Sequence, residues 1–207
     1  MNVTKVEAIT KTKFRVEVEE EFAFVLYKGE LKRYGVIEGE EISKETYDTI
    51  RKDVILKRAK LRAMHLLTDM PRTEKGLREK LKQNQYPEDL IDQAMDYVRS
   101  FGYLNDLRYA ENYIDLHKKQ KSRKELRGAL LQKGVPSEQI DLAFESFYDG
   151  EEELEAIQTL IRKKRVDVLH ATDEQLQKLY GYLGRKGFRY EQIRKAVEAL
   201  EDSEKGY

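Results

Sequence analysis

The sequence predicts a mainly α-helical protein of three tandem three-helix repeats, which form an elongated, curved body behind a small N-terminal antiparallel β segment. Three observations predict this fold class. One apolar pattern occurs three times along the chain, and period-2 alternation is confined to the first 42 residues. Charged residues make up 38% of the chain, which is typical of helices with a large wetted surface.

The N-terminal segment carries the strand pattern. Apolar and polar residues alternate over 14–18, and aromatic and aliphatic residues recur at every second position over 22–27. Gly29 is a turn residue between apolar runs. We therefore expect residues 22–27 and 30–37 to form a hairpin within a sheet of two to four strands.

A long helix is predicted next. Ser43 is a suitable N-cap, and the helical pattern runs from Lys44 to Thr68, just before Pro71. The apolar residues expected on one stripe of this helix are Tyr47, Ile50, Val54, Leu61, Met64 and Leu67.

An internal repeat predicts the fold of the rest of the chain. In the first copy the apolar positions are Leu77, Leu81, Tyr86, Ile91, Ala94, Met95 and Val98. A shift of 49 residues gives Leu126, Leu130, Val135, Ile140, Ala143, Phe144 and Phe147. A further shift of 53 gives Leu179, Leu183, Phe188, Ile193, Ala196, Val197 and Leu200. Seven matching positions in three copies indicate a stack of similar helical units that share their cores.

Each copy is expected to hold three helices, with a tight break between the second and third. The breaks fall at Gln85-Tyr86-Pro87, Gly134-Val135-Pro136 and Gly187-Phe188-Arg189. The first helices are expected at about 44–68, 106–118 and 150–164, and Ser122-x-x-Glu125 and Thr172-x-x-Gln175 match capping boxes. The predicted organisation is an N-terminal extension (1–42) and repeats at 43–104, 105–149 and 150–207.

Composition excludes several classes of protein. The 39 basic and 39 acidic residues cancel, so the chain is not a bulk polycation. It has no cysteine, which excludes disulfides and thiolate metal sites. No apolar run approaches the ~20 residues of a membrane span, and the N-terminus lacks a signal-peptide core. We expect a cytoplasmic protein without a membrane partner.

No catalytic constellation is visible. His65, His117 and His170 lie about fifty residues apart, which is not a metal-ligand spacing, and they are interpreted as surface or boundary residues. The run from Gly184 to Gly187 resembles an anion loop, but a helix C-terminus explains it better. We therefore expect no enzyme activity, no cofactor and no metal.

Basic residues cluster at two equivalent repeat positions. Residues 118–133 hold seven Lys or Arg against one acid, whereas residues 134–155 hold eight acids and no Lys or Arg. The candidate partner-binding residues are Lys118, Lys119, Lys121, Arg123, Lys124, Arg127, Arg162, Lys163, Lys164 and Arg165. They could form a stripe that meets phosphate or an acidic groove. The general preference of Lys and Arg for helix C-termini is an equally good explanation at this point.

Three segments resemble the RecX family. Residues 101–110 (FGYLNDLRYA) resemble the family signature, and 130–135 and 183–193 resemble its middle and last repeats, so the resemblance covers roughly 55–201. The N-terminal strands resemble the extension of longer family members. One departure is the Lys119-Gln120-Lys121-Ser122 stretch, where many members have Lys-Gly.

The resemblance implies a non-enzymatic regulator that binds the RecA recombinase. It implies a body lodged in the groove of the RecA–DNA filament that inhibits strand exchange, ATP hydrolysis and co-protease activity. We expect such a regulator to be a monomer with at most weak DNA contact. The alternative hypothesis is a helical-repeat protein that binds nucleic acid directly, with an affinity that falls steeply with salt.

Overall fold

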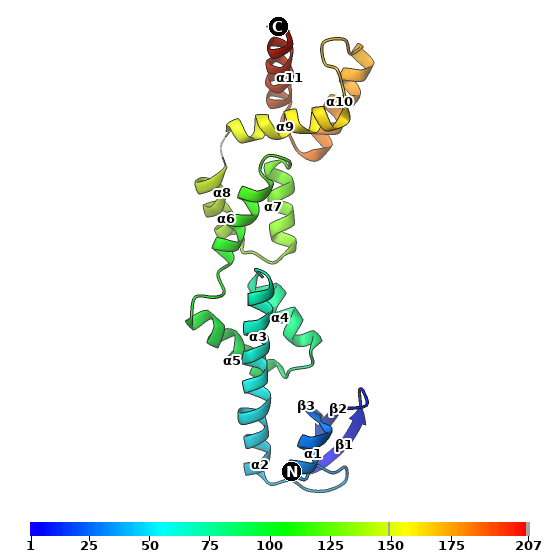
Figure 1. Cartoon of the computed structure of the whole chain (residues 1–207), viewed down its shortest axis with the longest axis vertical. Helices are drawn as coiled ribbons and strands as arrows, with labels where there is room; N and C mark the ends of the chain where they lie inside the picture. Colours follow the sequence, from blue (N-terminus) through cyan, green and yellow to red (C-terminus); the bar gives the residue numbers. More distant parts are fainter. Residues whose placement is uncertain (149, 206–207) are drawn as a thin grey trace. The chain divides into compact units, whose positions relative to one another are not determined.

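The computed structural model describes residues 1–148 and 150–205, and these divide into two compact units, Met1–Asn105 and Asp106–Tyr207. The first unit holds a three-stranded sheet and the first helical repeat, and the second unit holds the other two repeats (Figure 1). The predicted start of the third repeat adjoins Asp149, which lies outside the described residues, as do Gly206 and Tyr207.

The sheet is antiparallel, in the order β1 (Val3–Ala8), β2 (Lys13–Val18) and β3 (Glu21–Tyr27). Val16 lies opposite Val6 on one side and Phe24 on the other. One face of the sheet is the core of this region, where Val16, Phe24 and Leu26 are fully buried. The predicted alternation over 14–18 and 22–27 is thus confirmed as strands.

The predicted hairpin between 22–27 and 30–37 is wrong. β3 pairs with β2 across a turn at Glu19 and Glu20, both of which have positive φ. Residues after β3 form helix α1 (Lys28–Tyr34), because Glu30 accepts a hydrogen bond from the Tyr27 backbone N–H (2.8 Å) and caps the first turn. Gly35, at φ 61°, ends that helix.

One continuous helical stretch follows. It comprises α2 (Lys44–Thr49), a π-helical segment η1 (Ile50–Leu56) and α3 (Lys57–Asp69). Ser43 caps it as predicted, since its Oγ accepts from the Thr46 N–H at 3.0 Å. Ile50 and Ile55 pack in the sheet core, whereas Ala63 belongs to the core of the first repeat. This stretch is therefore shared by two cores.

The apolar stripe predicted on this helix is only partly correct. Ile50 is buried and Val54 is half-buried, but Leu61 is 63% exposed. A π-helix has more residues per turn than an α-helix, so the buried face is shifted beyond η1. Ala59, Ala63 and Leu66 are the residues that α3 buries.

The three repeats are similar helical triplets. Their helices are α3 with α4 (Glu74–Gln83) and α5 (Glu88–Ser100), then α6 (Asp106–His117), α7 (Arg123–Gln132) and α8 (Ser137–Phe147), then α9 (Gly150–Lys164), α10 (Asp173–Lys186) and α11 (Tyr190–Lys205). The first and third helices of each triplet pack against each other. The repeated apolar positions are buried in all three copies, except for half-buried Tyr86 and Phe147, which is 37% exposed.

The breaks between second and third helices have the same backbone conformation in each repeat. Gln85, Gly134 and Gly187 occupy equivalent positions, and their φ angles are 61°, 86° and 99°. The left-handed conformation reverses the chain after one helix so that the next can begin at once. The apolar residue that follows each break then packs into or against the core of its repeat.

The second helices are capped alike. Ser122 and Thr172 form the predicted capping boxes with Glu125 and Gln175. Thr73 was not predicted as a cap, but its Oγ1 accepts from the Gly76 N–H at 3.1 Å. Thr73 lies 49 residues before Ser122, which is the same shift that relates the apolar positions.

Candidate functional site

Among residues 1–148 and 150–205, no three His, Cys, Asp or Glu side chains gather as they would around a metal ion. His117 packs on the Tyr113 ring at 4.4 Å between centroids, and His170 contacts Asp167 at 2.9 Å. None of the described helices combines the length and the apolar character that a membrane crossing requires.

The basic end of α6 lies against the acidic beginning of α9. The Lys118 ammonium contacts the carboxylates of Asp115 (3.0 Å) and Glu152, and Lys119 contacts Glu155 at 3.2 Å. The contacts with Glu152 and Glu155 join the second repeat to the third. The sharp change from basic to acidic sequence therefore reflects, in part, charge pairing between neighbouring repeats.

Two further candidate side chains are bound within the second repeat. Lys121 donates to the Tyr113 hydroxyl at 3.1 Å. Arg127 forms an ion pair with Asp141 and donates to Ser137 Oγ at 2.6 Å. The guanidinium holds the pKa of the Asp141 carboxyl below its usual value, mainly through the hydrogen bond that it donates to that carboxylate.

The junction between the second and third repeats is closely packed. Ser122 is fully buried, and its hydroxyl donates to the Lys186 carbonyl oxygen at 2.5 Å. The Lys186 ammonium forms an ion pair with the Glu125 carboxylate at 2.8 Å. A Cβ built at Gly187 would lie only 2.7 Å from Lys124 Cβ, so the two repeats approach more closely than a larger residue would allow. Their relative placement is therefore fixed by packing.

A basic groove opens beside this junction. Its volume is about 460 Å³, and its lining includes Arg123, Lys124, Arg127 and Arg189 against one acid, Glu153, which accepts from Gln192. Arg123 lies over the Phe144 ring at 4.7 Å, so its position is fixed while its side chain stays exposed. The groove has the charge to hold an anionic partner surface.

Tyr148 forms part of the same lining. Its hydroxyl is buried and has no hydrogen-bond partner among the described residues. Burial raises the pKa of Tyr148, and the Glu153 carboxylate raises it further. The hydroxyl therefore stays protonated at neutral pH and lies beside the cations as an uncharged polar group.

The second predicted cluster does not share that groove. Lys164 and Arg165 line a separate hollow of about 490 Å³ within the third repeat, with Lys164 over the Tyr182 ring at 4.6 Å. Lys163 donates to Gln120 at 3.2 Å, while Arg162 is exposed. The structure thus brings Arg123, Lys124 and Arg127 together in one lining and places the 162–165 cluster elsewhere.

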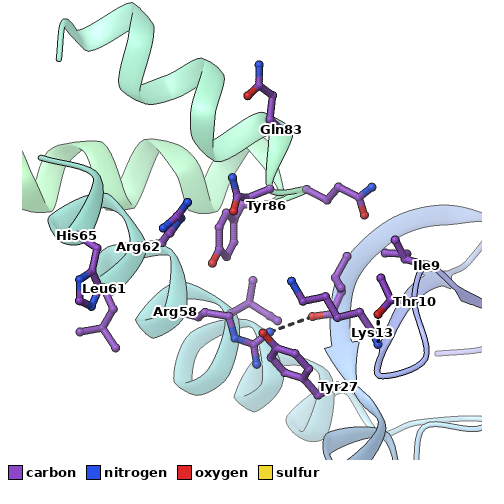
Figure 2. A pocket seen from close by; sticks show the side chains of 14 residues that line it. Ile9, Thr10, Lys13, Tyr27, Arg58, Leu61, Arg62, His65, Gln83 and Tyr86 are labelled. Atoms are coloured by element: carbon purple, nitrogen blue, oxygen red, sulfur yellow. Dashed lines mark hydrogen bonds between the residues drawn. The ribbon is translucent and has the colours of Figure 1, made fainter. Parts of the chain in front are cut away.

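Sequence reasoning missed two features. Arg189 lies far along the chain from Arg123, and neither it nor the nearby basic residues Arg185, Lys186, Arg194 and Lys195 were among the predicted partner-binding residues. A third hollow, in the N-terminal unit, is lined by the basic residues Lys13, Arg58 and Arg62 (Figure 2). Arg58 and Arg62 belong to a basic stretch at 57–62, but only the fold brings that stretch close to Lys13.

Comparison with known proteins decides the family. Models described as the first, second and third three-helix domains of RecX match residues 59–97, 105–143 and 151–197. The chain belongs to the RecX family. The RecX triplets of helices therefore correspond to the repeats described above.

RecX relatives match nearly the whole chain. "Regulatory protein RecX" of Caldanaerobacter subterraneus subsp. tengcongensis is 34% identical over 90% of this chain and 92% of its own. The protein of that name from Clostridium perfringens strain SM101 is 30% identical over 98% of this chain and 97% of its own. These names describe regulators, and this chain is accordingly a RecX-type regulatory protein.

Solved RecX structures share the fold. A crystal structure of regulatory protein RecX aligns with a TM-score of 0.62 at 24% identity, covering 94% of this chain and 98% of the other. RecX from Lactobacillus salivarius aligns with a TM-score of 0.60 at 22% identity over 70% of this chain and 96% of its own. The mainly helical RecX architecture predicted from the sequence is confirmed.

Proposed function

We propose that this protein binds the RecA recombinase filament on single-stranded DNA and lowers its ATPase, strand-exchange and co-protease activities. The observation that supports this proposal is the presence of three RecX three-helix domains. The second and third of them pack into one unit, which has a basic groove on its surface. The protein would act in the cytoplasm as a monomer, without a cofactor of its own.

We propose that the partner contacts use the exposed ends of the basic clusters. Arg123, Arg162 and Arg165 are exposed, and no carboxylate of the described residues forms an ion pair with them. Lys118, Lys119 and Arg127 are bound by acids, so in this proposal they support the surface from within. A cation that already has a carboxylate gains less from a second anion than an unpaired one does.

The test is the ATPase rate of RecA on single-stranded DNA as the protein is added. Near-stoichiometric inhibition is the expected result. The variant Arg123→Glu, Arg162→Glu, Arg165→Glu should inhibit at least about tenfold less well, because reversed charges repel an anionic surface. Its matched control reverses three exposed lysines elsewhere: Lys52→Glu, Lys75→Glu and Lys195→Glu.

Two results would contradict the proposal. If the arginine variant folds normally and inhibits as well as the unmodified protein, the partner does not contact these residues. If the unmodified protein has no effect on RecA but binds DNA tightly and in a salt-dependent manner, the helical repeats serve DNA directly. Measuring the DNA affinity of the protein alone separates the second result from simple inactivity.

A further inference from the structure

The hollow in the N-terminal unit lies between the sheet and the first repeat. Its volume of about 630 Å³ falls within the range of sites that hold small molecules or single residues of a polymer. Lys13 contributes from β2, Arg58 and Arg62 from α3, and Tyr86 from the break before α5. Figure 2 shows these four side chains facing a common space, with Tyr27 beside Arg58.

The lining has an excess of positive charge. Arg58 is compensated, because it forms an ion pair with Glu30 and donates to the Val25 carbonyl oxygen at 3.2 Å. Arg62 and Lys13 have no carboxylate at ion-pair distance within the described part of the chain. The residues that line the hollow include no Asp or Glu. Two uncompensated cations thus face the same open hollow.

Neutral hydrogen-bonding groups complete the lining. Burial raises the pKa of Tyr86, and Arg58 opposes part of that shift, so the hydroxyl remains protonated at neutral pH and can donate. The Gln83 side chain points away from these cations (Figure 2), and its carbonyl oxygen accepts from Lys80 at 3.0 Å. Gln85, in the left-handed conformation, contributes an exposed amide to the lining.

We propose that this hollow binds the phosphate backbone of a single-stranded nucleic acid. Lys13 and Arg62 would neutralise phosphate, and the Tyr86 hydroxyl would donate to a phosphate oxygen. The amide of Gln85 can both donate and accept, as the exposed edge of an unpaired base requires. The bases of a single strand are free to make such contacts, whereas those of a double helix are already paired.

Single-stranded nucleic acid fits these groups better than an acidic protein segment does. Carboxylates could use the two cations and a peptide backbone could bond to the amide, but each nucleotide of a strand carries both a phosphate and a base, which matches cations and an amide in one lining. The proposal concerns the N-terminal unit and direct binding without RecA. It therefore does not depend on the filament function proposed above.

The experiment measures binding of a short fluorescent oligothymidylate to the full chain by anisotropy, at several salt concentrations. The variant Lys13→Gln, Arg62→Gln should bind about tenfold more weakly. Its salt dependence should also be shallower by about 1.4 in log–log slope, because each phosphate contact on a single strand contributes about 0.7. The control Lys32→Gln, Lys75→Gln removes the same charge from exposed positions outside the lining.

Four outcomes would overturn the proposal. Unchanged binding by a correctly folded Lys13→Gln, Arg62→Gln variant would exclude the hollow. An equal loss in the control would show a general charge effect. Displacement of the oligonucleotide by oligoglutamate at a lower concentration than by unlabelled oligothymidylate would identify a protein site. If thymidine monophosphate displaces the oligonucleotide as well as unlabelled oligothymidylate does, at equal concentrations of nucleotide, the ligand is a free nucleotide. If the double variant is destabilised, Lys13→Gln alone, at an exposed position, provides the same test.

Discussion

The Ser122 hydroxyl accepts the Glu125 N–H at 3.1 Å and donates to the Lys186 carbonyl oxygen at 2.5 Å. One buried oxygen thus caps helix α7 and binds the end of helix α10 in the next repeat. Removing a cap residue that faces water destabilises only the end of its own helix. Here the same atom also satisfies a carbonyl group of the neighbouring repeat.

Replacing Ser122 by Ala should therefore cost about 2 to 3 kcal/mol of unfolding free energy, since the cap and the bond between repeats are both lost. Thr172→Ala is the matched control, because Thr172 caps α10 with the same geometry and faces solvent. That change should cost about 1 kcal/mol. Urea unfolding followed by circular dichroism measures both, and equal losses would refute the role of Ser122 at the junction.

Gly187→Ala should destabilise the junction more than a glycine change at an open site. At φ 99° an alanine is strained, and its Cβ would also collide with Lys124. Gly35→Ala is the control, because Gly35 ends a helix at φ 61° with open space around it. The control should lose about 1 to 2 kcal/mol from the left-handed conformation alone. A smaller loss for Gly187→Ala in thermal unfolding would show that the close approach is unimportant.

A charge swap tests whether Lys118 supports the surface or contacts the partner. Lys118→Glu places three carboxylates together with Asp115 and Glu152, so we expect lower stability and weaker RecA inhibition. The double variant Lys118→Glu, Glu152→Lys restores opposite charges across the same contact. Stability and inhibition should then recover together. Recovery of stability without inhibition would mean that the partner contacts Lys118 itself.

The pKa of His117 should lie below its usual value of 6.5, mainly because the ring is partly buried and also because Lys121 is close. The unfolded chain then takes up the proton first as the pH falls. Stability should decrease from pH 6.5 down to the folded pKa and change little below it. An NMR titration gives the value directly, and Lys121→Gln should raise it. A pKa at or above 6.5 would contradict this environment.

Tyr86→Phe tests the neutral donor in the proposed nucleic-acid site. The ring and its burial are kept, and one hydroxyl is removed. We expect about 2- to 10-fold weaker oligothymidylate binding, which corresponds to one hydrogen bond, with an unchanged salt slope because no charge is lost. Tyr103→Phe, at a 54% exposed tyrosine outside the lining, is the control. Identical effects of the two changes would exclude a specific role for Tyr86.

Much of the fold could be predicted because it repeats. Gln85, Gly134 and Gly187 stand at equivalent positions and share positive φ, so the spacing of breaks in the sequence corresponds to the spacing of turns in the structure. Residues 28–34 were predicted wrongly, because Glu30 caps a helix where Gly29 indicated a turn. The turn at Glu19 and Glu20 was not predicted, because glutamate rarely adopts the positive φ that both residues have there.

The candidate site was less predictable than the fold. The basic run could be read from the sequence, but its division into paired cations such as Lys118 and exposed ones such as Arg123 depends on which acids the next repeat brings close. Arg189 and Arg62 have basic neighbours in the sequence, but they lie far along the chain from Arg123 and Lys13. They join a site only through contacts between distant parts of the chain.

The helical stretch from α2 through η1 to α3 has a thermodynamic consequence for ligand binding. Ile55 is fixed in the sheet core, and Ala59 and Ala63, one and two turns further on, are fixed in the repeat core. Arg58 and Arg62 project from the helix between these anchors, so their wall of the hollow is preorganised when the chain folds. A ligand that enters would lose its own conformational entropy but would not have to order this wall of its site.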